Sequence, residues 1–430
     1  MDESGGDDVH PVFVLDPRLL GPAGGPRTAF LTGCLEALDR SMDGRLTILA
    51  GDPADQISRL ADKVGAGAVV AAADFGPYGT ERDEATGQAL QAAGRRFIRC
   101  ESPYAVMPGT VVNRSGAPYQ VYSGFYRAWR AAGWPKPVGA PRLDRLAGPV
   151  GRQAALPRPA LGEARLPAPG EAAATRRLAA FLRHVDRYAD ERDRPAIDGT
   201  SRLSAALRWG CLHPRQVLDR LGRSQGAETF RREIAWREFY ADVLFHRPET
   251  ARRSFQPAMA RLEVDTGRRT AARFDAWVAG RTGYPIVDAG MRQLRAEAWM
   301  HNRIRMIVAS FLVKDLHLDW TRGARHFMRF LVDGDLASNQ HGWQWVAGTG
   351  TDPSPFFRIF NPTAQGEKFD PDGDYVRRYV PELAGVPGKS VHRPWDLPGG
   401  PPNGYPGPIV DHAAERREAL DRYQTLRGAG

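Results

Sequence analysis

Short apolar runs alternate with helical patterns in the first third of the chain. Residues 11–15, 45–50 and 65–75 hold runs rich in Val, Leu, Ala and Ile, and helical spacing follows the first two. Strands that alternate with helices join in a parallel sheet. We therefore predict a Rossmann-like α/β domain over residues 1–139.

The rest of the chain reads as a linker followed by helices. Residues 140–170 are rich in Pro, Ala, Gly and Arg without apolar periodicity, which is typical of a linker. From residue 171 the apolar side chains recur at intervals of three and four. The clearest examples are Leu178, Phe181, Leu182, Val185 and Tyr188, and then Ile304, Ile307, Val308, Phe311 and Leu312. This pattern predicts an all-α domain over 171–430, with a last helix at about 413–425.

Composition narrows the class of protein. The chain has 430 residues, of which 42% are hydrophobic, enough for two folded domains. No apolar run approaches eighteen residues, and Met1 to His10 is acidic where a signal peptide is cationic and then apolar. Cys34, Cys100 and Cys211 are scattered, which argues against a disulfide scaffold or a zinc site. We expect a soluble protein of the reducing cytoplasm.

Positive charge gathers in the helical part. Residues 1–170 hold 19 Lys and Arg against 18 Asp and Glu, whereas residues 171–430 hold 40 against 32. Of the 59 basic residues 54 are Arg, which suits bidentate contact with phosphate. Genome composition explains an arginine bias equally well, so charge suggests a polyanionic partner without establishing one.

Two segments place polar groups on helices. In TSRLSAALRWG (200–210), Thr and Ser precede an apolar helical run as an N-cap cluster does, and the free amides there attract phosphate, with Arg202 beside them. A plain capped helix explains that run as well. In residues 230–246, Glu233, Trp236 and Tyr240 share a helical face, which fits either base contact or an ordinary core helix.

Two later segments carry denser chemistry. In residues 283–312, Asn302, Arg303, Arg305 and Met306 fall within one and a half turns of an apolar helix. Buried arginines need anions, which the segment 330–373 offers in Asp333 and Asp335, although an interdomain ion-pair network remains an alternative. A metal at the two aspartates is not expected, because only His341 lies nearby and the order of an EF-hand is missing.

These four segments, in this order, resemble the FAD-binding domain of DNA photolyases, and in particular the class I cyclobutane pyrimidine dimer enzymes. The resemblance covers nearly all of residues 45–425, and WMHNRIRMIVASFL with LVDGDLASNQHGWQW carries most of its specificity. It implies an α/β antenna domain followed by an all-α FAD-binding domain. It also implies light-driven repair, in which excited reduced FAD passes an electron to a dimer flipped out of the DNA, whose ring then splits.

The resemblance assigns the site residue by residue. It implies that FAD is held by Tyr188, Thr200, Ser201, Arg202, Leu203, Ser204, Arg305, Asp333, Gly334, Asp335 and Asn339, with Asn339 facing flavin N5. The residues implied at the dimer are Glu233, Trp236, Asn302, Met306 and Trp345. Those implied at the DNA phosphates are Arg192, Arg303 and Arg358. We expect DNA as the partner of a monomeric chain with no obligate protein partner.

A sensory flavoprotein of the cryptochrome type, without repair, is the alternative function. Plant-type cryptochromes tend to replace the repair-pocket Met and Trp, whereas Met306, Trp236, Trp345 and Asn339 are all present. The (6-4) enzymes use a histidine pair at the lesion, and here Met300 and His301 precede Asn302 as in dimer enzymes. A structural relative that keeps the flavin but has an unfolded antenna part is a further alternative.

The sequence departs from the family pattern at two places. Trp343 and Trp320 match the inner and middle members of the tryptophan wire that reduces the flavin, but Gly267 stands where the outer one belongs. We expect weaker photoreduction unless Phe274 or Trp277 substitutes. The strand at 12–20 resembles the second strand of the antenna domain, so the first strand–helix unit is missing and we expect a misplaced start. A second antenna chromophore, a deazaflavin or a folate, is correspondingly uncertain.

Overall fold

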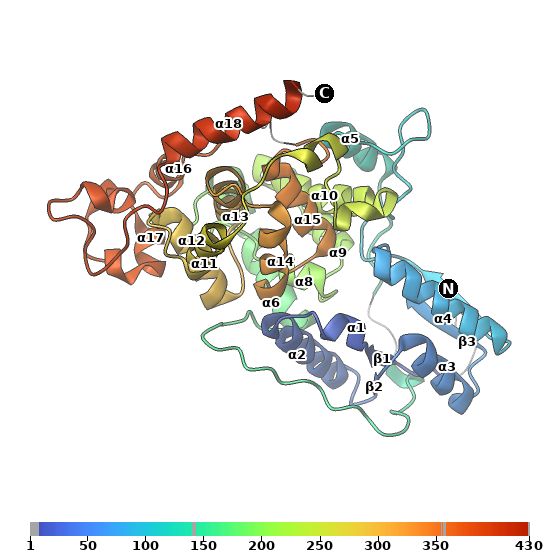
Figure 1. Ribbon diagram of the computed structural model, residues 1–430. Helices are drawn as coiled ribbons and strands as arrows, with labels where there is room; N and C mark the ends of the chain where they lie inside the picture. Colours follow the sequence, from blue (N-terminus) through green and yellow to red (C-terminus); the bar gives the residue numbers. More distant parts are fainter. Residues whose placement is uncertain (1–7, 140–142, 354, 356–357, 429–430) are drawn as a thin grey trace.

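An α/β part and a larger helical part lie side by side, with α2 (Gly25–Ser41) packed against the helical part (Figure 1). The computed structural model describes residues 8–139, 143–353, 355 and 358–428. The predicted fold class, an α/β part followed by a helical part, is confirmed. Residues 140–142, at the start of the predicted linker, and most of the acidic N-terminus lie outside the described residues.

The α/β part contains the three predicted strands and a fourth, β4, that the sequence analysis did not identify. β1 pairs with β2 and β3 with β4, both in parallel, so the described residues form two two-stranded sheets and not one. The missing first strand–helix unit stays a prediction. The elements are β1 (Val12–Leu15), α1 (Pro17–Leu20), α2, β2 (Thr47–Ala50), α3 (Pro53–Val64), β3 (Ala68–Ala72), α4 (Pro77–Ala92), β4 (Arg96–Cys100) and α5 (Tyr122–Ala132).

The segment from 143 to 170 contains no regular element except a short 3-10 turn at its start, among the residues described. Its backbone lies along β2, where the Ala154 amide donates to the Ile48 carbonyl at 2.8 Å and Gln153 Oε1 accepts from the Ile48 amide at 2.6 Å. Further on, the Arg165 amide donates to Ala296 of the helical part at 2.8 Å. The segment therefore covers the outer edge of β2 before it reaches the helices.

The helical part is built around α10, α12, α13 and α15, which pack against one another in pairs. In the part of the chain that the structure describes, no helix is both long and apolar enough to cross a membrane. The helices are α6 (Glu171–Leu182), α7 (Tyr188–Glu191), α8 (Ser204–Arg208), α9 (Pro214–Arg220), α10 (Gln225–His246), α11 (Arg268–Ala279), α12 (Pro285–Glu297), α13 (Asn302–Ser310), α14 (Trp320–Phe330), α15 (Leu336–Ala347), α16 (Pro362–Phe369), α17 (Asp374–Tyr379) and α18 (His412–Gly428).

Two predicted periodicities do not form single helices. The run from Leu178 to Tyr188 breaks at His184, whose φ of −126° and ψ of 7° are not helical, so α6 ends before a 3-10 turn and α7 begins at Tyr188. The buried side chains on both sides of the break still face one core. The second run passes from α13 into a π-helical turn at Phe311–Asp315.

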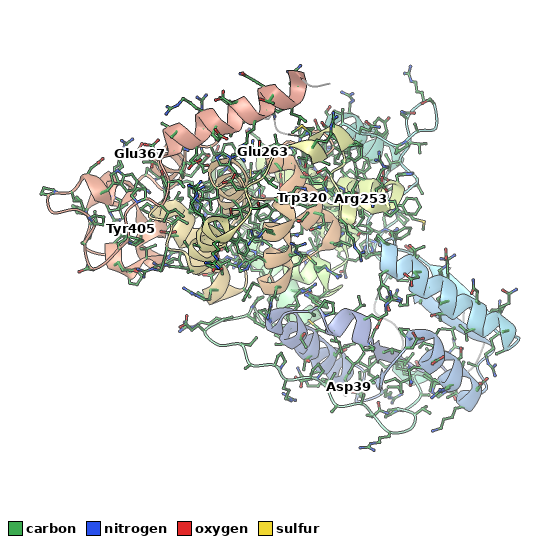
Figure 2. The ribbon with its side chains drawn as sticks, in the orientation of Figure 1. Asp39, Arg253, Glu263, Trp320, Glu367 and Tyr405 are labelled. Atoms are coloured by element: carbon green, nitrogen blue, oxygen red, sulfur yellow. The ribbon has the colours of Figure 1, made fainter. Side chains whose placement is uncertain are left out.

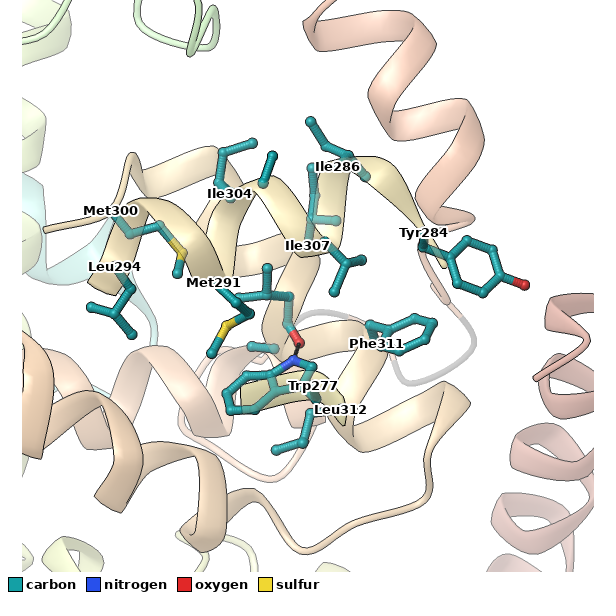
Figure 3. Close-up of a cluster of buried hydrophobic side chains, with 14 of the residues drawn as sticks. Trp277, Tyr284, Ile286, Met291, Leu294, Met300, Ile304, Ile307, Phe311 and Leu312 are labelled. Carbon is teal, nitrogen blue, oxygen red and sulfur yellow. Dashed lines mark hydrogen bonds between the residues drawn. The ribbon is translucent and has the colours of Figure 1, made fainter. Parts of the chain in front are cut away.

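The largest core lies where α11, α12 and α13 meet (Figure 3). Trp277 is fully buried there, and its indole Nε1 donates to the Val308 carbonyl at 3.0 Å. Gly290 lets α12 approach α13, because a Cβ at this position would lie 2.4 Å from Cγ2 of Ile304. The apolar face of α13 is thereby held at a fixed depth, which sets where its polar face lies.

A buried carboxylate joins the two parts. Glu238 of α10 accepts hydrogen bonds from the amides of Ala105 at 2.5 Å and Val106 at 3.1 Å, and from Nε1 of Trp129 in α5 at 2.6 Å. Its side chain is almost completely buried, and burial raises its pKa. Three donors from the first part of the chain thus converge on one side chain of the second.

We expect Glu238→Ala to lower the free energy of unfolding by about 3 kcal/mol, because it leaves buried amide and indole donors without an acceptor. Glu238→Gln, which keeps one carbonyl oxygen, should cost less. Urea unfolding followed by circular dichroism measures both. The exposed Glu84→Ala is the matched control, and an equal loss in that variant would contradict the role of the shared carboxylate.

Candidate functional site

An ion pair between α13 and the loop before α15 forms the centre of the site. Nη2 of Arg305 lies 2.7 Å from Oδ2 of Asp333, and Nε of Arg305 donates to the Met300 carbonyl at 2.8 Å. The side chain of Asp333 is 2% exposed, yet its second oxygen, Oδ1, is buried without a hydrogen-bond partner among the residues that the structure describes. The predicted anionic partner of Arg305 is thus confirmed, and one carboxylate oxygen remains to accept a further hydrogen bond.

The segment 200–211 folds against the same loop. Trp209 Nε1 donates to the Val332 carbonyl at 2.9 Å, and Arg208 Nε donates to the carbonyl of Gly334 at 3.2 Å and lies 3.9 Å from Asp335 Oδ2. Asp335 in turn caps α15, accepting from the Ser338 amide at 2.8 Å. Burial acts to raise the Asp335 pKa, but the charges of Arg208 and Arg237 and this hydrogen bond leave the pKa lowered. The carboxylate stays ionised.

The expected N-cap cluster at 200–204 is wrong in detail. α8 begins at Ser204 and its N-cap is Leu203, whose side chain makes no cap hydrogen bond. Ser201 Oγ accepts from the Leu203 amide at 3.3 Å, because Arg202 adopts a left-handed φ of 50° that turns the chain before the helix starts. The backbone carbonyls of Thr200 and Ser201 accept hydrogen bonds from the Arg177 guanidinium, at 2.7 and 2.8 Å.

Arg202 lies over the ring of Trp299, 4.3 Å from its centroid, and its Nη1 pairs with Glu297 at 3.0 Å. Trp299 Nε1 also lies 3.3 Å from Ser204 Oγ. The guanidinium that the sequence analysis places at phosphate is therefore already paired. Neither Trp299 nor Glu297 was predicted as a site residue, although Trp299 lies within the WMHNR motif.

A second ion pair connects α10 to the turn after α7. Nη1 of Arg192 lies 2.7 Å from Oε1 of Glu233, and the guanidinium also lies 5.6 Å from the centroid of the Tyr188 ring. Tyr188 is buried edge-to-face against Phe230. Burial raises the pKa of Glu233, while the charge of Arg192 opposes that rise. Three predicted residues thus meet, and Arg192 is paired with a carboxylate.

Trp236 stacks on an aromatic ring from the other part of the chain. Its indole lies 3.7 Å from the Tyr122 ring, centroid to centroid, with 7° between the planes. Tyr122 is the first residue of α5 and was not predicted, because nothing in the local sequence indicates which distant ring a Trp will meet. One face of Trp236 is therefore covered, and a planar group can stack only on the other.

Asn302 and Met306 lie on α13, Asn339 and Trp345 lie on α15, and the two helices pack together. Asn302 is exposed at the first position of α13, whereas Met306 and Trp345 are partly buried against the main core. Asn339 Nδ2 donates to the Ala324 carbonyl of α14 at 3.1 Å and to Gln340 Oε1 at 2.8 Å. Gly334 is buried, with Arg27 and Met328 near its Cα.

Three tryptophans lie along the core beside these helices. Trp343 is buried with its Nε1 unpartnered, and its ring fits against α14 because residue 323 is Gly, where a Cβ would lie 2.1 Å from the indole. Trp320, at the centre of the helical part (Figure 2), donates from Nε1 to Ser254 Oγ at 3.3 Å. Trp277 lies 6.2 Å from Trp343 between ring centroids, so it adjoins the inner member of the predicted wire, whereas a substitute for the outer member has to adjoin the middle one, Trp320.

No described side chain fills the position that corresponds to the outer tryptophan. Gly267 is exposed at the N-cap of α11 with a φ of 94°, and nothing lies within 4 Å of a Cβ built there. Trp277 itself is fully buried, and Phe274 stacks on it at 5.8 Å. Besides Trp343, the rings next to Trp277 are the phenyl rings of Phe274 and Phe327 and the imidazole of His326, so a route through Trp277 meets no further tryptophan among these neighbours.

Two of the three arginines predicted at the DNA phosphates, Arg192 and Arg303, form ion pairs with carboxylates of the protein. Arg303 pairs with both oxygens of Asp193, at 3.2 and 3.0 Å, and lies over Phe369. Asp193, and not Asp333 or Asp335, is thus its anion. Arg358 is exposed, and its backbone carbonyl accepts from Lys314 Nζ at 3.1 Å.

The residues present fit a flavin nucleotide. Asp333 Oδ1 and Trp343 Nε1 are buried polar atoms without partners, and both lie on the elements that carry the predicted flavin contacts. A carboxylate oxygen accepts from a ring N–H, so the orphaned Oδ1 matches the edge of a flavin. Among the residues described, no group of three His, Cys, Asp or Glu side chains is placed to hold a metal ion.

Comparison with known proteins is in accord with this site. Residues 3–142 match the family model of DNA photolyase, and residues 230–425 match that of the FAD binding domain of DNA photolyase. A deoxyribodipyrimidine photo-lyase of Halobacterium salinarum is 39% identical over 99% of this chain and 94% of its own length.

Two solved structures are similar throughout. A class III photolyase from Agrobacterium tumefaciens superposes with a TM-score of 0.89 and 37% identity, covering 98% of this chain and 93% of its own. An archaeal photolyase from Sulfolobus tokodaii, described with two FAD molecules, has a TM-score of 0.85 and 29% identity and covers 98% and 94%.

The stability of the protein should depend on pH through His301, the N-cap residue of α13. His301 is buried and caps the helix by accepting from the Arg303 amide at 3.2 Å, and burial lowers its pKa to about 4. An unfolded histidine titrates near 6.5, so the unfolded chain binds the extra proton first, and stability is lost as the pH falls from about 6.5 towards 4. Between pH 7 and 5 this one group should cost about 2 kcal/mol.

His301→Asn keeps a capping side chain but has no proton to take up. Urea unfolding at pH 7 and pH 5 should show a drop in stability that is smaller in the variant by about 2 kcal/mol. The same substitution at the exposed His184 controls for removal of an imidazole as such. Identical drops in the parent protein and His301→Asn would contradict the prediction.

Proposed function

The chain belongs to the DNA photolyase family, and on that basis we propose how its own residues carry out light-driven repair of pyrimidine dimers in DNA. Reduced FAD, when bound, supplies the electron on excitation by blue light. The observation that carries the proposal is the ion pair between Arg305 and the buried Asp333, whose second carboxylate oxygen is free, beside the segment 200–211. The protein binds, orients and shields, and the cofactor supplies the redox chemistry.

The flavin is held between α13, α15 and the segment 200–211. Asp333 Oδ1 would accept from the isoalloxazine edge, while Arg305 holds and orients the carboxylate through Oδ2. Asn339 would lie at N5, and Asp335 and Gly334 would contact the cofactor. Tyr188 and the run Thr200, Ser201, Arg202, Leu203 and Ser204 hold its phosphates. Since Glu297 already pairs with Arg202, phosphate either shares that guanidinium or displaces the carboxylate.

The flipped-out dimer lies between polar and apolar groups of α10, α13 and α15. Glu233 and Asn302 contact the bases, Glu233 as a hydrogen-bond acceptor and Asn302 as donor or acceptor. Met306 lies against the dimer. Trp345 stacks on it, and so does Trp236, through the face that Tyr122 leaves open.

Arg192, Arg303 and Arg358 contact the DNA phosphates on either side of the lesion. Arg358 is exposed, whereas Arg192 and Arg303 are held by Glu233 and Asp193. These two carboxylates hold the two arginine side chains in place. The net positive charge of the helical part attracts DNA, which is a polyanion.

Repair is favoured over a purely sensory function. Relatives that are 39–40% identical over nearly the whole chain are named deoxyribodipyrimidine photo-lyases, whereas a structurally similar cryptochrome is only 25% identical. Met306, Trp236, Trp345 and Asn339, which the sensory proteins tend to replace, are present here. The class I assignment stays a prediction, because one similar structure is a class III enzyme.

A cavity of about 780 Å³ between α2 and the helical part suggests where a second chromophore binds. Its lining includes Arg27, Arg176 and Arg208, which suit an anionic ligand, and its volume lies in the range of small-molecule sites. The Sulfolobus photolyase is described with a second FAD as a light-harvesting cofactor. We propose a deazaflavin, folate or flavin for this cavity.

We also infer that the chain acts as a monomer in the cytoplasm and needs no obligate protein partner. DNA is the partner for which the site is built. Light scattering on the eluting protein, with and without a damaged oligonucleotide, tests the monomer. A stable dimer in both conditions would overturn it.

The test of the function is direct. The purified chain, with its flavin reduced, is mixed with an oligonucleotide that carries one thymine dimer and is exposed to blue light. We expect the dimer to disappear in the light and to persist in the dark. Binding of the lesion without any repair in the light would favour the sensory alternative.

We expect Trp345→Ala and Trp236→Ala each to weaken binding of the damaged oligonucleotide by about 1 to 3 kcal/mol, because a base loses its stacking partner. Binding of undamaged DNA should change little, since no base is flipped there. Fluorescence anisotropy measures both. Trp395→Phe, which alters a tryptophan outside the proposed site, is the control, and a uniform loss on both DNAs would contradict the stacking role.

Photoreduction of the flavin should be slower than in a relative with a complete tryptophan wire, because Gly267 offers no side chain at the outer position. Trp343→Phe should lower it further, and Trp277→Phe against Trp320→Phe shows which ring follows Trp343. Absorbance of the oxidised flavin under blue light measures the rate. Repair by chemically reduced enzyme should survive all three substitutions. A rate equal to that of the complete wire would remove the prediction.

A further inference from the structure

Two cysteines from different parts of the chain meet where the parts join. Sγ of Cys34, in α2, lies 3.4 Å from Sγ of Cys211, in the turn between α8 and α9, although 177 positions separate them in sequence. Cys100 is the third cysteine, and its thiol points to the Ala71 carbonyl at 3.8 Å. Only a tertiary contact brings the first two sulfurs together.

The backbones around the pair are held closely. A Cβ on Gly33 would lie 2.6 Å from Cγ of Pro169, and a Cβ on Gly170 would lie 2.6 Å from Cβ of Ala37, so α2 lies directly against the start of α6. One turn before Cys34, Phe30 contacts the Trp209 ring at 6.4 Å between centroids. The distance between the sulfurs is thus set by packed elements.

The surroundings favour one thiolate in the pair. Either thiol can donate the hydrogen bond between the two sulfurs. The contact with Cys34, together with the Gly170 amide, lowers the pKa of Cys211 to about 7, although burial opposes it. The same contact and burial raise the pKa of Cys34. A thiolate next to a neutral thiol is the arrangement that reacts with oxidants.

Small oxidants can reach the pair. Both cysteines line the 780 Å³ cavity between α2 and the helical part, and Cys34 is only half-buried. Structural cysteines that are sealed in a core are inert, whereas sensor cysteines are accessible and lie next to a resolving thiol. Cys34 has the position of a resolving thiol and Cys211 that of the attacking one.

We propose that Cys34 and Cys211 are a redox-responsive pair whose oxidation by a peroxide or a low-molecular-weight disulfide cross-links α2 to the turn after α8. With hydrogen peroxide, the Cys211 thiolate attacks one oxygen, the O–O bond breaks, and after protonation a sulfenic acid and water result. Cys34 sulfur then attacks the sulfenic sulfur, the S–O bond breaks, and a second water leaves. A dithiol reductant restores both thiols by exchange.

Formation of the bond needs a local movement only. The sulfurs must approach from 3.4 Å to about 2.05 Å, a shortening of about 1.35 Å. The turn follows the segment whose residues contact Val332, Gly334 and Asp335, so the cross-link would tie the α/β part to the proposed flavin loop. In a reducing cytoplasm the pair rests as thiols and closes under oxidative stress.

Mass spectrometry of the full-length protein tests the bond. After treatment with hydrogen peroxide, alkylation under denaturing conditions and tryptic digestion without reductant, peptide 28–40 should be joined to peptide 209–215. Free thiols should fall from three to one, and dithiothreitol should restore them. Cys100→Ser should still form the link, whereas Cys34→Ser and Cys211→Ser should not.

The stability of the oxidised protein gives a second readout. A bond that closes a loop of this length restricts the unfolded chain, so the oxidised form should unfold several degrees higher than the reduced form. Cys34→Ser, which keeps the fold contacts of a small side chain, should show no such shift. Oxidation of Cys211 to a sulfinic acid or a stable mixed disulfide without the 28–40 to 209–215 link would overturn the proposal. Neither readout depends on flavin or DNA repair, so the proposed function stands or falls separately.

Discussion

The site depends on a carboxylate that the fold buries before any ligand is bound. Asp333 is held by Arg305 on one oxygen, while its other oxygen has no partner. A buried charge is stable only when it is paired, so α13, which carries Arg305, and the loop before α15, which carries Asp333, must stay at one separation. The helices on either side, and the segment that folds back through Arg208 and Trp209, are positioned around this pair.

The same principle joins the two parts of the chain. Glu238 gathers two amides and an indole from the first part into the helical core. At the opposite side, α2 meets the helical part through glycine-mediated backbone contact and the pair of sulfurs. Tyr122, which begins α5, reaches across to stack on Trp236. The α/β part therefore contributes side chains that pack against the site, in addition to its proposed antenna role.

Much of the site consists of charges that are already paired. Arg192 with Glu233, Arg202 with Glu297, and Arg303 with Asp193 each present a guanidinium at a fixed place. A paired arginine costs little further ordering when an anion arrives, because its side chain is already immobilised. The cation excess of the helical part is thus organised by local carboxylates, and net charge alone describes it poorly.

The amino-acid sequence by itself determined three of the four strands, the division into an α/β and a helical part, and the family with its flavin cofactor, because periodicity and the long motifs at 299–312 and 331–345 are local properties. It also offered Asp333 and Asp335 as anions for the arginines of α13, since a buried arginine requires an anion, and the structure pairs Arg305 with Asp333. Only the tertiary structure decided that β1–β2 and β3–β4 pair separately and that His184 breaks a regular apolar pattern. It also decided that Leu203 occupies the N-cap position of α8, without a side-chain hydrogen bond to the helix. It alone brought Tyr122 to Trp236, Asp193 to Arg303 and Cys34 to Cys211. Such contacts join residues about a hundred or more positions apart, and their energy depends on packing geometry that no local pattern encodes.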